Sequence, residues 1–313
     1  MSQIAKLQSH IEQVEGLIED NINRLKGVGD NYGLKLGLKS LENQLEELQQ
    51  QLRSENIKRE KEIIKLRLKG SPAHYGNLPL DYVGGLTTSF SSAIFQISKY
   101  LQYGNKGGRK KEKIVRNTID LRLENIAKGS TIFYISGKTS PDLFGNSIIQ
   151  DALNNTFEFL ESDSPNEISE TVLKVGANSI KYFCDFFKEL NEDDLEVEIN
   201  WKTPCNSKKQ WKGSKDRILS MYNSLNQIKV SEPEEIDFVG ELITISKKGF
   251  FEITTDENEK FRVKFPNGSL PIMKSFHVAD RCEGLIFKTL ISNPLAEKER
   301  PEYTLKEIKR KEE

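Results

Sequence analysis

Apolar residues among the first sixty positions recur at alternating steps of three and four, which is the a/d spacing of a helical heptad. The spacing runs through one segment, breaks at the glycine-rich stretch 27–33 and resumes in a second segment. A short break of this kind returns the second helix along the first. The pattern therefore predicts an antiparallel helical hairpin of coiled-coil type over residues 1–60.

The apolar seam of this hairpin is where a partner chain would be selected. Its candidate positions are Leu7, Val14, Asn21, Leu34, Leu38, Leu41, Leu45, Leu48 and Leu52. Asn21 is the polar residue among them and fits a role in setting the register of the seam. Two interpretations stay open: the two helices bury the seam against each other, or the seam pairs with another protein or with a second copy.

After residue 62 the hydrophobic pattern changes from a helical period to a period of two. Alternating segments at 63–68, 119–126, 131–136 and 195–201 predict strands, the middle two as a hairpin. Helical spacing at 79–103, 146–160, 168–190 and 214–225 predicts helices between and after them. This order lacks a regular alternation of strands and helices, which favours an α+β domain over residues 61–230.

The acidic stretch 231–235 is predicted to be a linker, and the chain changes character after it. Strand patterns at 237–245, 250–254 and 261–265 precede a short helical piece near 270–275 and two further strands at 283–291 and 303–308. Three strands, a helix and two strands form the element order of a five-stranded OB-like barrel. We expect a small β-barrel over residues 231–313, with other small barrels open as alternatives.

Composition limits the function classes. Lys and Arg number 46 against 47 Asp and Glu, a formal net charge of -1, so any attraction for nucleic acid must be local. Cys184, Cys205 and Cys282 lack the spacing of a disulfide framework or a zinc site, which favours a reducing, cytoplasmic location. The sequence has no signal peptide and no apolar run of membrane-spanning length, so no membrane association is expected.

The sequence contains no recognisable catalytic, cofactor or metal motif. Gly137–Ser140 resembles the end of a phosphate-binding loop, but Ile132 stands where its first glycine belongs, so a turn is the better interpretation. The histidines have no metal-ligand partner at suitable spacing. We expect no cofactor and no metal, and the sequence does not favour enzymatic activity, although an active site built from dispersed residues has no motif.

Three basic patches are candidates for nucleic-acid binding, because cations neutralise phosphates and exposed aromatic rings stack on unpaired bases. The first consists of Arg109, Lys110, Lys111 and Lys113, the second of Trp201, Lys208, Lys209, Trp211 and Lys212, and the third of Lys260, Arg262 and Lys264 on the barrel. The alternative is that Trp201 and Trp211 anchor a hydrophobic core and the lysines keep the surface soluble.

A succession of different short motifs lies along the chain, at Leu66–Gly70, Leu78–Leu80, Gly129–Ile132, Glu198–Trp201, Gly240–Leu242 and Phe250–Ile253. In these the chain resembles, over residues 62–310, a broad family of uncharacterised bacterial proteins that combine an α+β domain with a C-terminal small β-barrel. Members tend to occur near mobile-element or phage-defence genes, so the resemblance implies a part in a multi-gene antiphage defence system. It supplies no catalytic residues.

The function that the sequence favours is that of a non-catalytic adaptor or sensor subunit of a multi-component bacterial complex. It would oligomerise or dock on a protein partner through the hairpin. The first alternative is a single-stranded nucleic-acid-binding protein that uses the Trp/Lys patch or the barrel. The second is an enzyme with a dispersed, unrecognised site.

Overall fold

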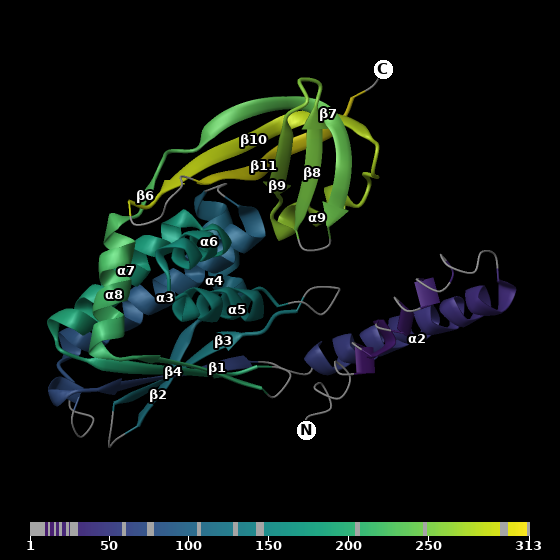
Figure 1. Ribbon diagram of the computed structural model, residues 1–313. Helices are drawn as coiled ribbons and strands as arrows, with labels where there is room; N and C mark the ends of the chain where they lie inside the picture. Colours follow the sequence, from purple (N-terminus) through teal and green to yellow (C-terminus); the bar gives the residue numbers. More distant parts are fainter. Residues whose placement is uncertain are drawn as a thin grey trace.

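The computed structural model of the chain contains helices, a five-stranded sheet and a β-barrel (Figure 1). The structure describes residues 10–11, 13–15, 17–18, 21–22, 25, 31–57, 61–73, 78–104, 108–127, 131–141, 147–203, 207–246, 249–294 and 300–311. Within these ranges, no helix is long and apolar enough to cross a membrane.

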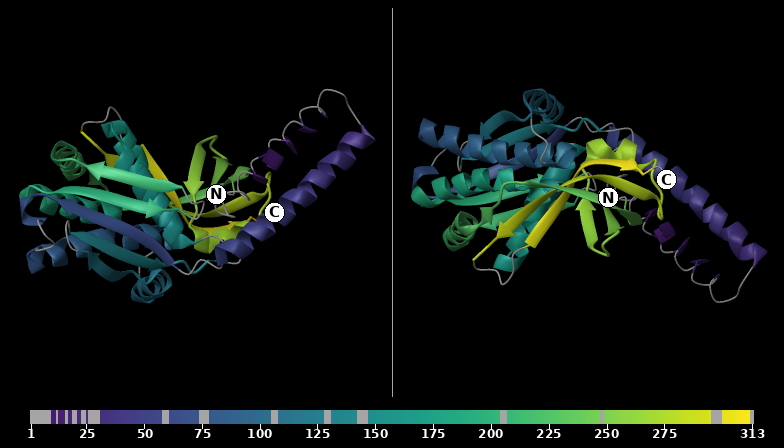
Figure 2. Two further views of the ribbon diagram at one scale, coloured as in Figure 1. Left: turned by 90° about the horizontal axis from the view of Figure 1, so that it is seen from below. Right: turned by 90° about the horizontal axis from the view of Figure 1, so that it is seen from above.

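The second predicted N-terminal helix is α2, Tyr32–Ile57, and it extends away from the rest of the molecule (Figure 1; Figure 2). The described residues between positions 10 and 25 are also helical. Val14 and Leu48 are buried, at 2% and 7% exposed, whereas Asn21 is half-buried. The remaining described seam positions, Leu34, Leu38, Leu41 and Leu45, are also half-buried.

Some of the predicted seam lies outside what the structure describes, namely Leu7 and the side chain of Leu52. The amide of Asn21 donates a hydrogen bond to the carbonyl of Leu17, one turn earlier in its own helix, at 3.1 Å. This contact is local and adds nothing to the proposed role of Asn21 in setting register. Pairing of coiled-coil type therefore stays a prediction.

The central sheet is antiparallel throughout, in the order β2-β3-β1-β4-β5. Its strands are β1 Lys61–Lys69, β2 Arg122–Ala127, β3 Ile132–Lys138, β4 Glu196–Lys202 and β5 Lys208–Gly213. Ile64 of β1 lies opposite Ile135 on one side and Trp201 on the other, and all three are buried. The strands predicted at 63–68, 131–136 and 195–201 are confirmed as β1, β3 and β4, and so is the β2–β3 hairpin. The predicted start of its first strand at residue 119 is wrong, because a helix ends at Ile119 and β2 begins at Arg122.

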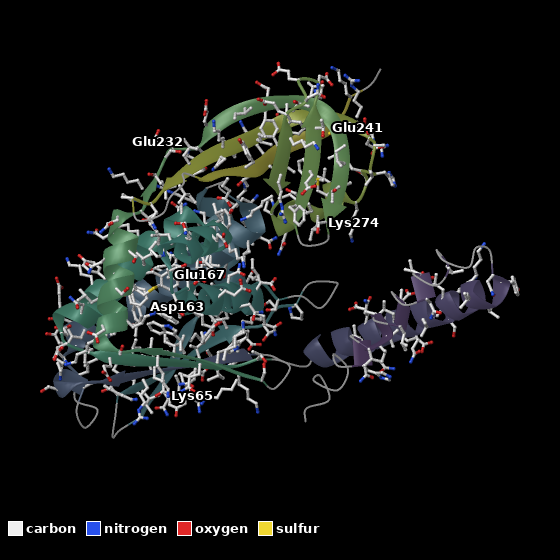
Figure 3. All side chains as sticks on the ribbon, in the orientation of Figure 1. Lys65, Asp163, Glu167, Glu232, Glu241 and Lys274 are labelled. Carbon is white, nitrogen blue, oxygen red and sulfur yellow. The ribbon has the colours of Figure 1, made fainter. Side chains whose placement is uncertain are left out.

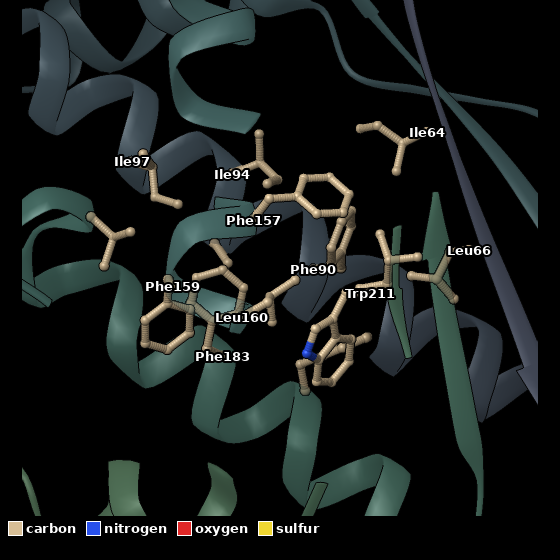
Figure 4. Packing of buried hydrophobic residues seen from close by; sticks show 14 of the residues in the cluster. Ile64, Leu66, Phe90, Ile94, Ile97, Phe157, Phe159, Leu160, Phe183 and Trp211 are labelled. Carbon is tan, nitrogen blue, oxygen red and sulfur yellow. The ribbon is translucent and has the colours of Figure 1, made fainter. Parts of the chain in front are cut away.

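Helices cover one face of this sheet (Figure 1). They are α3 Leu80–Tyr103, α4 Arg109–Ile119, α5 Ile148–Glu161, α6 Pro165–Val175, α7 Ala177–Glu192 and α8 Lys215–Gln227, with a short 3₁₀ turn at Ser71–Ala73 before them. The core between helices and sheet is rich in phenylalanine; Phe90, Phe157, Phe159 and Phe183 gather there with Trp211 (Figure 4). Burial of such large rings contributes much of the stability of this unit.

The prediction of a single helix over 168–190 is wrong, because the chain forms two helices there. Gly176 separates α6 from α7 and has φ 78°, a backbone conformation that glycine adopts readily. The ring of Tyr100 packs against it, and a Cβ at Gly176 would lie 2.6 Å from Tyr100 Cγ. The first of the two helices also begins earlier than predicted, since Ser164 and Glu167 form a capping box at its N-terminus.

The C-terminal region forms a closed five-stranded mixed barrel. Its elements are β7 Glu234–Ser246, β8 Phe250–Thr255, β9 Lys260–Lys264, a 3₁₀ turn at Asn267–Ser269, α9 Leu270–Met273, β10 Arg281–Ser292 and β11 Arg300–Arg310. Antiparallel pairs join β7 to β8, β8 to β9, β7 to β10 and β10 to β11, and a parallel pair of β9 with β11 closes the ring.

The predicted linker at 231–235 is shorter than expected, because Glu234 and Glu235 already belong to β7. The residues just before it, Lys229–Val230, form β6 and pair with the end of β10. The short strand β6 therefore extends the sheet of the barrel just before the chain enters β7.

The barrel packs against the helical layer on the side away from the central sheet (Figure 1). Glu302 of β11 is 5% exposed at this junction and accepts hydrogen bonds from the phenol of Tyr100 and from Lys264 Nζ, the latter at 3.1 Å. Lys264 Nζ also donates to the carbonyl of Leu173 in α6 at 2.8 Å. The backbones of the barrel and of α3 also approach each other closely at this junction, because a Cβ at Gly268 would lie 2.8 Å from the Gln102 carbonyl oxygen.

Candidate nucleic-acid interface

The face of the central sheet opposite the helices is covered by no described element (Figure 1). Basic side chains outnumber acidic ones on it. Side chains alternate between the two faces of a strand. In β1 the even-numbered residues from Glu62 to Leu68 are buried, so the odd-numbered residues face water. These exposed residues are Lys61, Ile63, Lys65, Arg67 and Lys69.

The strand register carries this basic face across to β5. Residues directly opposite each other in antiparallel strands lie on the same face. One row across the sheet is Tyr134, Lys65, Asn200 and Gln210, the next is Ile132, Arg67, Glu198 and Lys212, and Lys202 lies opposite Lys208. Lys65 points away from the helices, on the open side (Figure 3). Cations from three adjacent strands therefore lie together on one face.

Acidic residues on this face are fewer than basic ones; they are Glu124, Glu196 and Glu198, and neighbouring side chains engage Glu124 and Glu198. Glu124 accepts hydrogen bonds from Lys61 at 2.7 Å and from Ser136 at 2.7 Å, and these bonds hold its pKa below the usual value. Glu198 accepts from Asn200 at 3.2 Å and also from Gln210, and Lys69 lies 3.4 Å away. The Asn200 hydrogen bond is the main cause of its lowered pKa. Both carboxylates are thus kept ionised by neighbours on the same face.

Lys65, Lys208 and Lys212 form no ion pair with any residue that the structure describes, and all three are exposed. The ammonium of Lys65 lies 5.4 Å from the centre of the Tyr134 ring, a weak cation–π contact that leaves its charge uncompensated. An anion that approaches this face therefore meets cations not already neutralised by carboxylates.

Trp201 and Trp211 do not belong to this surface, which corrects the prediction that they stack on bases. Both indoles are buried on the helix side of the sheet. The Trp201 Nε1–H donates to Glu62 at 2.6 Å, and the Trp201 ring stacks on Phe157 at 6.2 Å between centroids. Trp211 packs against Phe187 at 5.9 Å. The alternative interpretation of the tryptophans as core anchors is the one the structure supports.

The lysines predicted beside these tryptophans divide between the two faces. Lys208 and Lys212 lie on the open face, because they pair with Lys202 and Glu198. Lys209 pairs with Trp201 and so lies on the helix side of the edge strand, which separates it from the other two. Two of the three predicted lysines therefore join the open face.

The patch predicted at Arg109–Lys113 lies on α4, within the helical layer and not on the open face of the sheet (Figure 1). Arg109, Lys110 and Lys113 are exposed, while Lys111 Nζ lies 5.2 Å from the centre of the Tyr103 ring. The structure does not bring this patch together with Lys208 and Lys212.

The barrel patch is likewise separate and partly used for structure. Arg262 is exposed and its guanidinium carbon lies 3.8 Å above the centre of the Phe250 ring, and Lys260 is exposed nearby. Lys264 is taken up by Glu302 and Leu173 at the junction with the helices. Phe251, which follows Phe250 in β8, is buried in the barrel core. Of the three predicted barrel cations, Lys260 and Arg262 therefore remain exposed to a ligand.

The cations of β1 are not among the residues predicted from the sequence, although the strand carries a signal for them. The segment Lys61–Lys69 reads KEIIKLRLK, in which a basic residue stands at most of the outward positions. Recognising a shared surface required the register with Asn200 and Gln210, which lie more than a hundred residues later in the chain.

In the described part of the chain, no three His, Cys, Asp or Glu side chains converge in a way that could hold a metal ion. No protein-family model matches the chain, and the chain matches neither a curated protein nor a solved structure.

Proposed function

We propose that this chain binds nucleic acid through the open face of its central sheet. The observation that carries the proposal is the grouping of Lys65, Lys208 and Lys212 on one uncovered face without carboxylate partners among the described residues. Cations of this kind bind phosphate groups and release their condensed counterions, which supplies most of the affinity in sequence-independent binding.

A solvated sheet face is ordinary in antiparallel proteins, so exposure alone supports nothing. Segregation of charge is the stronger argument. The chain as a whole has a formal net charge of -1, yet on this face basic side chains outnumber the carboxylates of Glu124, Glu196 and Glu198. Neighbouring side chains already bind Glu124 and Glu198. A surface that served solubility alone would mix both signs.

The barrel is proposed to be of the OB type, a class that often binds oligonucleotides. Its support is the strand order, in which the first strand pairs with the second and fourth and the third runs parallel to the fifth. A fold alone does not assign a ligand. Glu252 lies directly opposite Arg262 on this barrel, so the barrel face is less basic than the open sheet face.

The test is a charge reversal on the open face of the full chain. Lys65→Glu combined with Lys212→Glu should weaken binding of a labelled oligonucleotide, measured by fluorescence anisotropy between about 50 and 200 mM salt. For a single strand, the slope of log K against log salt should fall by about 0.7 for each phosphate that the variant no longer neutralises. Thermal unfolding checks that the variant folds, since exposed lysines contribute little to stability.

The matched control is Lys110→Glu combined with Lys113→Glu, which makes the same charge change on α4, away from the open face. Equal losses of affinity in the two double variants would mean that only net charge matters, and would contradict the proposal. Binding that does not respond to salt would contradict it as well.

A second candidate function is that of a non-catalytic adaptor or sensor subunit that docks through the N-terminal helices. It is supported by apolar side chains on α2 that the chain leaves in water, Tyr32 at 81% and Leu36 at 59% exposed. Light scattering coupled to size exclusion should then give an oligomer mass that falls in the Tyr32→Ser, Leu36→Ser variant. A monomer mass for both proteins would remove the self-association form of this hypothesis.

A further inference from the structure

We infer that the ligand of the open face is a single-stranded polynucleotide, DNA or RNA, whose bases rest on Tyr134, Ile63 and Ile132 while its phosphates follow the lysines of β1, β4 and β5. The inference rests on the function proposed above and names its substrate class. It comes from how apolar and cationic side chains are divided across the face.

The β3–β1 side of the face carries its apolar side chains. Tyr134 and Ile132 of β3 are half-buried, and Ile63 of β1 is 38% exposed. Register places Tyr134 opposite Lys65, and Ile132 opposite Arg67. Ile63 lies opposite Ser136, one row from Tyr134. Ile63 and Tyr134 are diagonal neighbours, about 7–8 Å apart, and Ile132 follows Tyr134 on the same face of β3. The three side chains therefore form one short apolar strip.

The β4–β5 side carries no exposed apolar side chain among its outward described residues. It presents Glu196, Glu198, Asn200 and Lys202 of β4 and Lys208, Gln210 and Lys212 of β5, so its cations are Lys202, Lys208 and Lys212. Adjacent strands are about 4.8 Å apart, so the lysines of β5 lie roughly 10 Å from β1 across the sheet. The cationic strip therefore runs beside the apolar strip at a distance set by the strand spacing.

This division fits a strand whose bases are unpaired. Bases of a single strand can splay to one side and stack on aromatic or apolar side chains, while the backbone lies along a positive track. A duplex keeps its base faces stacked inside the helix, so it would engage the lysines and leave Tyr134 without a partner. Lys65 lies between the two strips, with its ammonium 5.4 Å from the Tyr134 ring centre, where base and backbone would meet.

The experiment compares one sequence in three forms, as single-stranded DNA, as single-stranded RNA and as the DNA duplex, each binding the full chain in anisotropy titrations. Tighter binding of either single strand than of the duplex supports the inference, and the preference between the two single strands identifies the natural sugar. A duplex that binds as tightly as both single strands overturns the inference.

Substitutions at Tyr134 separate stacking from charge. Tyr134→Ala should weaken single-strand binding by about 5- to 150-fold, the range for loss of a stacked base, without changing the salt slope. Tyr134→Phe keeps the ring and should bind within about threefold of the parent. Phe250→Ala on the barrel, where Arg262 covers the ring, is the matched control and should leave binding unchanged.

The outcomes also separate this inference from the proposed function. If the lysine reversals weaken binding but Tyr134→Ala does not, the face binds phosphate backbone without stacking, and only the inference fails. If neither nucleic-acid form binds in a salt-dependent way, or if polyglutamate displaces the oligonucleotide at equal charge concentration, the proposed function fails with it. Should Tyr134→Ala not fold, the comparison of single strand with duplex on the parent chain still decides.

Discussion

Replacing Trp201 by phenylalanine should cost stability and leave nucleic-acid binding intact. Trp201 is 1% exposed, and its Nε1–H donates to the carboxylate of Glu62, which is itself buried, at 2.6 Å. Glu62 also accepts from the side-chain amide of Gln150 at 2.8 Å. The substitution removes one donor from a buried carboxylate and reduces the ring that packs on Phe157.

The expected loss of unfolding free energy has two parts. A hydrogen bond to a charged group contributes about 1.5–3 kcal/mol, because the carboxylate left behind stays desolvated. The smaller ring loses about 1–2 kcal/mol of buried surface and packing. We expect Trp201→Phe to lower the unfolding free energy by about 2.5–5 kcal/mol, the sum of these two contributions.

The assay is urea unfolding followed by tryptophan fluorescence. The chain has two tryptophans, both buried in the core of the central unit, so the signal reports on that unit and Trp211 remains in the variant. A double-mutant cycle with Glu62→Met isolates the hydrogen bond, since on that background Trp201→Phe should cost only the packing part.

A coupling energy below about 0.5 kcal/mol in this cycle would refute the reasoning, because it would mean that the Trp201 N–H contributes nothing through Glu62. Oligonucleotide affinity is the second readout. If Trp201→Phe, while folded, weakened binding as much as Tyr134→Ala, the Trp201 ring would have to be reachable by a base, contrary to its burial.

Two further predictions concern the contacts around Tyr100. Gly176→Ala should destabilise the chain by about 2–5 kcal/mol in thermal or urea unfolding, because its φ of 78° disfavours alanine and its Cβ would collide with the Tyr100 ring; Gly84→Ala, in open space on α3, is the control and should be neutral or stabilising. Burial and the neighbouring Glu302 raise the pKa of Tyr100 well above its ordinary value of 10.0, so its neutral form contributes stability that is fully present below pH 10 and is lost as pH rises through the higher folded pKa. Unfolding measured across pH 8 to 12 should therefore show a steeper alkaline loss in the parent than in Tyr100→Phe, and parallel curves would contradict this.

Elements with a clean hydrophobic period could be predicted from the sequence, and those shaped by distant contacts could not. β1 and β4 alternate strictly because one of their faces is buried by helices. The edge strand β5, Lys208–Gly213, has Trp211 as its one large apolar residue, so alternation gives no signal there. The break at Gly176 was missed because apolar spacing continues through it, whereas the break depends on the Tyr100 ring packed against that position.

The candidate site was predictable in part for a similar reason. Lys208 and Lys212 stand out beside a tryptophan in the sequence, but the sequence could not say that the indole faces inward while they face outward. Lys65 and Tyr134 join them only through the pairing of β3, β1, β4 and β5. Their grouping is a property of register, which local pattern does not contain.

The same alternation that builds the core fixes the chemistry of the open face. Ile64, Leu66 and Leu68 must face the helices to be buried, and this forces Lys65 and Arg67 outward. A shift of β1 by one residue would place those charges in the core, at a desolvation cost far above the stability of a domain. The position of the basic face is thus held by the hydrophobic core beneath it. Substitutions of its lysines should therefore change binding without moving the strands, which is why the charge reversals proposed for Lys65 and Lys212 can report on function separately from folding.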